Sequence, residues 1–255
     1  MKQLLVIGIG AGNPEYITMQ AVNALNRVDV FFLMDKGQSK DKLIDLRREI
    51  CERYITDPAY RFVEAHSPER LRGDVDYNAS VVELNRDKQQ IFERLINEEM
   101  AEDECAAFLV WGDPALYDST LRILQAIIES GRCTFNFEVI PGISSVQALA
   151  AQHKVPLNRI GRSVEITTGR RLAAGQVSDA DSLVVMLDAE DSYRQVADQE
   201  QQIYWGAYLG TPDEILISGK LKDVAQEIAR VRKAARLANG WIMDTYLLRK
   251  PESPE

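Results

Sequence analysis

The chain has 255 residues, of which 45% are hydrophobic and 27% charged, with 30 basic and 39 acidic side chains for a formal net charge of -9. This length suits one large domain or two modest ones. The acidic balance argues against nucleic acid or an anionic membrane surface as the main partner, and no stretch approaches the roughly 20 apolar residues of a membrane helix.

The first half of the chain alternates apolar strands with amphipathic helices. Apolar runs predict strands over 4–9, 29–34, 106–110 and 135–140, and apolar residues at helical spacing predict helices over 18–28, 40–54, 77–100 and 119–128. This alternation is typical of a doubly wound parallel α/β sheet.

The second half alternates less regularly. We expect strands over 163–168, 183–187, 203–209, 214–218 and 241–247, and helices over 144–152 and 221–237. Several of these strands follow one another too closely for a crossover helix, so part of the pairing must be antiparallel. The sequence therefore predicts an α/β protein of two domains, with a mostly parallel sheet in residues 1–112 and a mixed sheet in residues 113–255.

Cysteine and histidine are scarce. Cys51, Cys105 and Cys133 are odd in number and form no Cys-x-x-Cys pair, which argues against a disulfide framework or a zinc site. His66 and His153 have neither metal-binding spacing nor a nucleophile motif beside them, so we expect no metal. The chain starts directly with its first apolar strand, without a cleavage site, and we expect a cytoplasmic protein.

Three glycine-containing turns each follow an apolar strand, at 8–12, 111–114 and 141–145. Taken singly, each has a structural explanation: a tight turn, a turn in which Asp113 caps the next helix, and a helix cap by Ser144 or Ser145. Taken together, they fall at the carboxyl edge of a parallel sheet, where α/β proteins bind ligands. We therefore expect the three turns to outline one site.

The first turn also allows a nicotinamide interpretation, with Asp35 on the ribose. A dinucleotide fingerprint requires a third glycine that opens a helix, whereas here Asn13 and Pro14 follow and the helical pattern waits until about Thr18. An oxidoreductase is the weaker alternative. Asp35 could equally act as a base or merely begin a turn.

The segment 154–171 is basic in an acidic chain. Its five cations against one acid, Glu165, give it a charge of +4, and the cations are Lys154, Arg159, Arg162, Arg170 and Arg171. The arginine fork matches carboxylate geometry, so the segment is suited to a polyanionic ligand. The alternative is an ordinary solvated surface.

The sequence resembles the tetrapyrrole methylases, in blocks that span nearly the whole chain. The resemblance is carried by residues 8–18, 112–117, 141–145 and 155–157, and by the later segments 183–187, 205–207 and 211–214. It implies an enzyme that moves the methyl group of S-adenosylmethionine onto a precorrin of cobalamin synthesis. It further implies a homodimer of two α/β domains with a cleft between them, the first on the macrocycle side and the second with cofactor and dimer contacts.

Residue roles follow from the resemblance by position. It implies that the cofactor is bound by Ala11, Gly112, Asp113, Leu116, Tyr117, Ser144, Ser145, Leu187, Gly206 and Ala207. It suggests Asp35 as the catalytic base, and we expect Arg162, Arg170 and Arg171 to hold the carboxylates of the macrocycle. Two features depart from the family pattern: Ala11 stands where many relatives have proline, and no Phe-Gly follows the Gly-Asp-Pro block. Methyl transfer depends mainly on positioning, which suits a chain with few histidines. Another methylase of the family remains an alternative.

Overall fold

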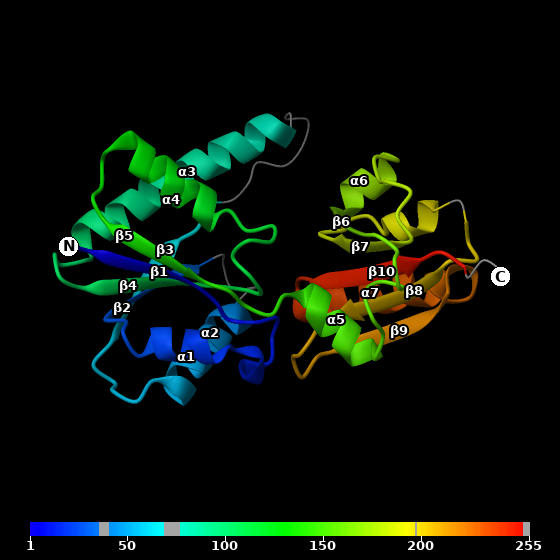
Figure 1. The fold of residues 1–255 in the computed structure, drawn as a ribbon, viewed down its shortest axis with the longest axis horizontal. Helices are drawn as coiled ribbons and strands as arrows, with labels where there is room; N and C mark the ends of the chain where they lie inside the picture. Colours follow the sequence, from blue (N-terminus) through cyan, green and yellow to red (C-terminus); the bar gives the residue numbers. More distant parts are fainter. Residues whose placement is uncertain (36–40, 69–76, 197, 252–255) are drawn as a thin grey trace. The chain divides into compact units, whose positions relative to one another are not determined.

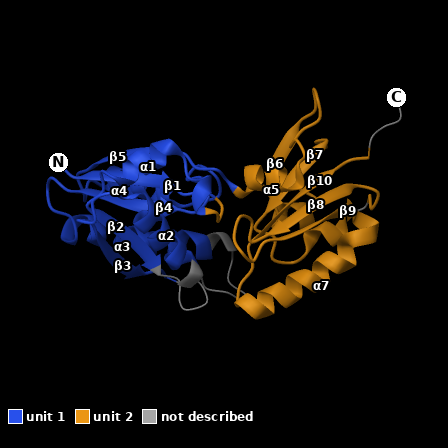
Figure 2. Cartoon of the chain, turned by 90° about the horizontal axis from the view of Figure 1, so that it is seen from below, with its two compact units in different colours: residues 1–10, 14–144 blue, residues 11–13, 145–255 orange. Residues whose placement is uncertain are grey.

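The structure is a computed structural model that describes residues 1–35, 41–68, 77–196 and 198–251. The chain forms two compact units, one of residues 1–10 and 14–144 and the other of residues 11–13 and 145–255 (Figure 2). The division thus falls after Ser144, later than the boundary expected at residue 112. The reason is that β5 (Asn136–Ile140) pairs with β1 (Gln3–Gly8) and so belongs to the first sheet.

The first unit is built on a five-stranded sheet of order β3-β2-β4-β1-β5. Its remaining strands are β2 (Val30–Asp35), β3 (Arg61–His66) and β4 (Cys105–Val110). Every pairing in this sheet is parallel. The central strands β1 and β4 are buried along almost their whole length, which explains their continuous apolar sequences.

Helices cover both faces of this sheet (Figure 1). One face carries α1 (Met19–Leu25) and α2 (Asp41–Tyr54), and the other carries α3 (Tyr77–Glu98) and α4 (Thr120–Ser130). Successive residues of β1 serve the two cores in turn: Leu5 packs with the α1 and α2 side and Leu4 with the α3 and α4 side. This is the doubly wound arrangement expected from the sequence.

The second unit is built on a mixed sheet of order β6-β7-β10-β8-β9. These strands are β6 (Val164–Thr168), β7 (Ser182–Met186), β8 (Gln202–Ala207), β9 (Ile215–Lys220) and β10 (Asp244–Arg249). The pair β6 and β7 is parallel and the other three pairs are antiparallel. The mixed pairing expected for this half is therefore confirmed.

Two longer helices pack on opposite faces of the second sheet, α5 (Ser145–His153) on one and α7 (Leu221–Asn239) on the other (Figures 1 and 2). Two short elements complete this unit, α6 (Gly169–Ala173) and the 3-10 helix η3 (Ser192–Gln195). The core on the α7 side centres on Trp205 of β8, which is fully buried.

Candidate functional site

The first two glycine turns are bonded to each other. Gly10 and Gly112 form an antiparallel bridge, in which the amide of Gly112 donates to the carbonyl of Gly10 at 2.8 Å and the reverse bond measures 3.4 Å. Both residues have positive φ, +85° and +71°, a conformation that favours glycine. The chain segments that follow β1 and β4 are thereby held side by side.

The third turn meets the other two because its glycine carries no side chain. A Cβ on Gly142 would lie 2.1 Å from the carbonyl oxygen of Gly112 and 2.8 Å from the carbonyl carbon of Gly8. A Cβ on Gly8 would lie 2.6 Å from the nitrogen of Gly142. Such backbone approach is open only to glycine. The expectation that the three turns lie together is confirmed, at the carboxyl edge of β4, β1 and β5.

Asp113 fastens this junction. Its Oδ2 accepts the amide of Gly142 at 2.9 Å, and its Oδ1 accepts the amide of Ala115 at 2.7 Å. It does not cap α4, because the carboxylate there belongs to Asp118, whose Oδ1 accepts the amide of Thr120 at 2.7 Å. Both oxygens of Asp113 therefore hold main chain in place.

Three further expected cofactor residues of the first unit are Leu116, Tyr117 and Ser144. The amide of Leu116 donates to the Asp113 carbonyl at 3.2 Å. Tyr117 is 42% exposed and has a φ of +52°. This left-handed backbone conformation is costly for a residue other than glycine. Ser144 is buried, and its Cα lies 3.5 Å from where a Cβ on Gly112 would be.

In the second unit, Thr245 brings several expected site residues together. It pairs with Met186 of β7 on one side and with Gly206 of β8 on the other. Its hydroxyl donates to the Ser145 hydroxyl at 3.0 Å. Ser145, Gly206 and Leu187, which follows Met186, are thus placed around Thr245, a residue that the sequence did not single out.

Leu187 is an exposed side chain on a strained backbone. It is 64% exposed, yet its φ is +54°. The segment 11–13 belongs to the same unit: Ala11 is buried, and a Cβ on Gly12 would lie 2.3 Å from the carbonyl oxygen of Leu209. Five expected cofactor residues therefore lie in the first unit, Gly112, Asp113, Leu116, Tyr117 and Ser144, and five in the second, Ala11, Ser145, Leu187, Gly206 and Ala207.

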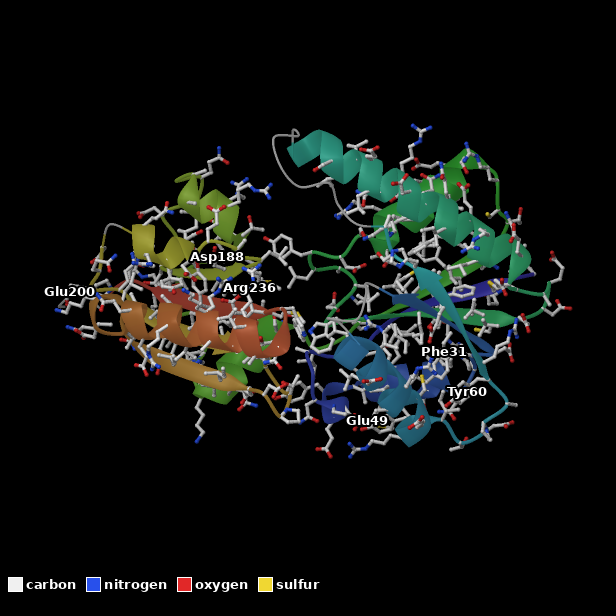
Figure 3. The ribbon with its side chains drawn as sticks, turned by 180° about the vertical axis from the view of Figure 1, so that it is seen from behind. Phe31, Glu49, Tyr60, Asp188, Glu200 and Arg236 are labelled. Carbon is white, nitrogen blue, oxygen red and sulfur yellow. The ribbon has the colours of Figure 1, made fainter. Side chains whose placement is uncertain are left out.

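Asp188, which follows Leu187, is a buried anchor that sequence reasoning missed (Figure 3). Its carboxylate accepts the amide of Ser192 at 2.7 Å and the hydroxyl of Tyr246 at 2.7 Å. A Cβ on Gly169 would lie 2.5 Å from its Cγ, so α6 begins directly against this carboxylate. Asp188 therefore fixes both the Leu187 turn and the helix that carries Arg170 and Arg171.

A second buried carboxylate, Asp244, is linked to Asp188 through Arg232. Nε of Arg232 on α7 donates to Oδ2 of Asp244 at 2.9 Å, and the same oxygen accepts the indole NH of Trp205 at 3.0 Å. Arg232 also donates to the main-chain carbonyl of Asp188. Arg232 pairs with Asp191 as well, at 3.2 Å. Since a buried charge needs a partner, removal of Arg232 would leave the buried carboxylate of Asp244 without its cation.

The arginines of the basic segment have different surroundings. Arg162, Arg170 and Arg171 are exposed, the last two on α6. Arg159 instead pairs with Asp181 at 2.9 Å and is partly buried. Only the first three of these four therefore present their side chains to solvent.

The remaining candidates are described less fully. Asp35 is the last residue of β2 and pairs with His66 of β3, but its side chain lies outside the described residues. His153 is half-buried, its Nε2 lies 3.0 Å from the carbonyl oxygen of Trp205, and burial lowers its pKa. The described residues contain no cluster of three or more potential metal ligands.

All three cysteines are free thiols. Burial raises the pKa of Cys51 to about 12 and that of Cys105 to about 11, so neither is a ready nucleophile at neutral pH. None of the helices in the described segments has both the length and the apolar character that crossing a bilayer requires.

The nicotinamide alternative loses its structural basis. After Gly12 the chain forms the 3-10 helix η1 (Pro14–Tyr16), and α1 begins only at Met19 with Thr18 as its N-cap. A dinucleotide fingerprint requires an α-helix that opens at the glycine turn, and α1 begins too late to be that helix.

Comparison with protein families gives a match over most of the chain. Residues 3–225 match the family described as Tetrapyrrole (Corrin/Porphyrin) Methylases. The chain is 50% identical over 250 residues to the precorrin-6A synthase [deacetylating] of Sinorhizobium sp, which covers 98% of this chain and 96% of that protein.

Solved structures agree. A Corynebacterium diphtheriae protein described as related to cobalamin synthesis superposes with a TM-score of 0.84 at 35% identity, covering 99% of this chain and 100% of that one. A uroporphyrin-III C-methyltransferase of Thermus thermophilus in complex with S-adenosylhomocysteine has a TM-score of 0.57 at 16% identity, with 97% of each chain covered. At 16% identity, the similarity to the Thermus thermophilus enzyme shows a shared fold.

Proposed function

Since this chain belongs to the tetrapyrrole (corrin/porphyrin) methylases, which depend on S-adenosylmethionine, we propose that it methylates C1 of precorrin-5 and releases acetate to give precorrin-6A. The Sinorhizobium relative supports this member of the family, because its similarity extends over nearly all of both chains. The sequence segments 33–37, 111–120 and 203–208 favour the same member.

The junction of the three glycine turns is the observation that carries the proposal. The missing side chains of Gly8 and Gly142 let the three turns pack against one another at the carboxyl edge of the first sheet, where α/β proteins bind ligands. We propose that main-chain groups of these turns contact the nucleoside of the cofactor.

The chemistry of the ten proposed cofactor residues fits a sulfonium. None of them is Lys or Arg, and one, Asp113, carries a negative charge. The bound cofactor supplies a methyl group on a positively charged sulfur, and a cation beside it would repel that charge. Both oxygens of Asp113 bind amides, so we assign it the role of holding the Gly142 turn in place.

These residues contribute chiefly by position. We propose that main chain at Gly112 and Leu116, with Tyr117 and Ser144, orients the methyl donor. For the second unit we propose the cofactor residues that the family resemblance implies, Ala11, Ser145, Leu187, Gly206 and Ala207. Alignment of the attacking ring carbon with the methyl carbon and its sulfur lowers the barrier to methyl transfer without an acid or a base. The left-handed backbone at Tyr117 and Leu187 supports a functional role, because strain of this kind gathers at such sites.

We assign Arg162, Arg170 and Arg171 to the carboxylates of the macrocycle. All three are exposed, and the last two lie on α6, a short helix that starts against Asp188. Guanidinium groups bind carboxylates through paired hydrogen bonds. These arginines can therefore bind a macrocycle with several carboxylates even though the chain as a whole is acidic.

Release of acetate requires water at the acetyl carbonyl, and we assign the base to Asp35. Its backbone ends β2, and the sheet is parallel, so Asp35 lies at the same carboxyl edge as the glycine turns. We also propose that the enzyme is a homodimer, as the family resemblance implies, and that it is cytoplasmic, as the scattered unpaired cysteines suggest. Sedimentation of the purified protein at micromolar concentration tests the dimer.

The direct test is turnover. Purified protein is incubated with precorrin-5, made by the preceding pathway enzymes, and with S-adenosylmethionine labelled in its methyl group. We expect a macrocycle that gains one labelled methyl and a matching amount of free acetate. A labelled macrocycle without acetate would point to another methylase of the family, and absence of any labelled macrocycle would refute the proposal.

A further inference from the structure

A cavity of about 120 Å³ lies at the carboxyl ends of β2, β3 and β4. Met34, Ser67 and Trp111 line it from the ends of these strands, and Lys88 of α3 lines it from the helical side. Trp111 directly precedes Gly112, so the cavity is adjacent in sequence to the glycine junction.

A partly buried cation, Arg47, lines the cavity. Arg47 of α2 donates through Nε to the carbonyl of Leu109 at 3.0 Å and through Nη1 to the carbonyl of Leu43 at 2.7 Å. Both partners are neutral, so they orient the guanidinium without cancelling its charge. Burial lowers the pKa of Arg47 to about 10, which still leaves it positive at neutral pH.

A second cation and a helix start face the same space. Nζ of Lys88 donates to the hydroxyl of Ser119 at 3.3 Å, and Ser119 is the N-cap residue of α4 but makes no side-chain capping bond. The start of an 11-residue helix carries partial positive charge. Among the described residues that line the cavity, Asp118 is the acid, and it accepts the amide of Thr120. These described residues thus contribute two cations and one carboxylate to the walls.

Three phenylalanine rings also line the cavity. Phe92 and Phe108 stack with their ring centres 4.2 Å apart, and Phe32 packs on Phe108 at 5.2 Å. The cavity thus combines cationic and aromatic lining side chains. Its volume is a few times the roughly 30 Å³ that one water takes up in the liquid, so it suits a small ligand.

We propose that this cavity binds a short alkyl carboxylate, with the carboxylate at Arg47 and Lys88 and the alkyl part against the phenylalanine rings. The inference rests on the proposed function for the source of the ligand, which is either the acetate released by the reaction or an acid side chain of the macrocycle. Binding itself can be tested without turnover.

The test is a titration of the ligand-free protein with sodium acetate, followed by NMR at the Arg47 Nε resonance, with sodium chloride at equal ionic strength as reference. We expect a saturable shift with acetate that chloride does not produce. Lys88→Gln should weaken acetate binding about tenfold or more, because it removes a charge-assisted hydrogen bond. Arg86→Gln, an exposed position on the same helix, should leave it unchanged.

Arg47→Lys provides a second variant that keeps the charge but loses the guanidinium fork, and we expect weaker acetate binding in a folded protein. Equal responses to acetate and chloride, or acetate binding that Lys88→Gln leaves intact, would overturn the proposal.

Turnover in added acetate separates the two sources. If the cavity holds a macrocycle side chain, acetate competes with the macrocycle and Lys88→Gln raises KM. If it receives the released acid, acetate inhibits without competing and Lys88→Gln leaves KM unchanged. Acetate binding without methyl transfer would refute the proposed function alone, whereas methyl transfer without acetate binding would refute this inference alone.

Discussion

Oδ2 of Asp113 accepts the amide of Gly142 at 2.9 Å, and this bond ties the turn after β4 to the turn after β5. We predict that Asp113→Asn weakens binding of S-adenosylhomocysteine about tenfold and lowers the free energy of unfolding by about 1 kcal/mol, because an amide offers one acceptor oxygen where the carboxylate offers two. Equilibrium dialysis and urea unfolding measure the two effects. Asp57→Asn, in which Oδ1 of Asp57 similarly accepts the amide of Ala59 two residues on, is the matched control and should leave affinity unchanged. Equal affinities in both variants would remove Asp113 from the site.

Alanine substitutions at two glycines separate the effect of close backbone contact, at Gly142, from the effect of a positive φ, at Gly131. In Gly142→Ala the new methyl would lie 2.1 Å from the carbonyl oxygen of Gly112, so we expect a loss of about 3 kcal/mol in unfolding free energy and loss of cofactor binding. Gly131 has a φ of +67° with nothing within 4 Å of a Cβ. Gly131→Ala should cost about 1 kcal/mol and leave cofactor affinity intact. A Gly142→Ala protein with full affinity would contradict the proposed junction.

Substitution of glycine for Leu187 should raise the stability of the protein and lower its affinity for the cofactor. Leu187→Gly relieves left-handed backbone and should raise the unfolding free energy by about 0.5 kcal/mol, since the gain exceeds the added flexibility of glycine. The same change should weaken cofactor binding, because the exposed side chain is lost. Lys154→Gly, at a φ of +57°, relieves the same strain outside the proposed cofactor residues. It should stabilise the protein without a change in affinity; a parallel fall in affinity in both variants would contradict the assignment of Leu187.

Arg170 and Arg171 should bind the macrocycle and not the cofactor. The double variant Arg170→Ala, Arg171→Ala should raise KM for the macrocycle at least about tenfold, because two exposed guanidinium groups are lost. Affinity for S-adenosylhomocysteine should stay the same. Arg236→Ala, at an exposed position on α7, serves as the control (Figure 3). Unchanged macrocycle KM in the double variant would refute this role.

Acid should remove one ion pair of the first unit. Two hydrogen bonds from Arg61, at 2.6 and 2.9 Å, lower the pKa of Glu104 to about 2. A carboxyl whose folded pKa is lowered stabilises the native state above its unfolded pKa of about 4.3, and that contribution is lost as pH falls toward 2. Because Arg61 is 48% exposed, the loss should amount to only about 1 kcal/mol.

Urea unfolding between pH 5 and pH 2.5 checks this, with Glu104→Gln expected to reduce the slope. Glu98→Gln, at an exposed position on α3, should keep the wild-type slope. Identical slopes for wild type and Glu104→Gln would show that the pair contributes nothing.

The sequence predicted most elements because their apolar patterns are local. Strands β1 and β4 are buried on both faces, and α4 has a clear apolar stripe, so a short stretch of sequence is enough to predict each of them. Strand β3 was missed because it is an edge strand with exposed Arg61, Glu64 and His66. Helix α6 was missed because it has only five residues.

What the sequence did not predict depends on contacts between distant residues. The pairing of β5 with β1, which moves the unit boundary, joins segments more than a hundred residues apart. The resemblance named Asp113, but its bond to Gly142 is visible only in the fold. Asp188 and Thr245 carry no motif, and their roles come from hydrogen bonds to Tyr246 and Ser145, respectively. Apolar periodicity reports burial of side chains and says nothing about such polar partners.

Calorimetric titration of the purified protein with S-adenosylhomocysteine tests the central claim most directly, because the glycine junction was assigned to the methyl donor independently of the macrocycle. The account predicts saturable binding at one site per chain, abolished by Gly142→Ala and retained by Gly131→Ala. Absence of binding to the wild-type protein, or equal binding to both variants, would contradict it.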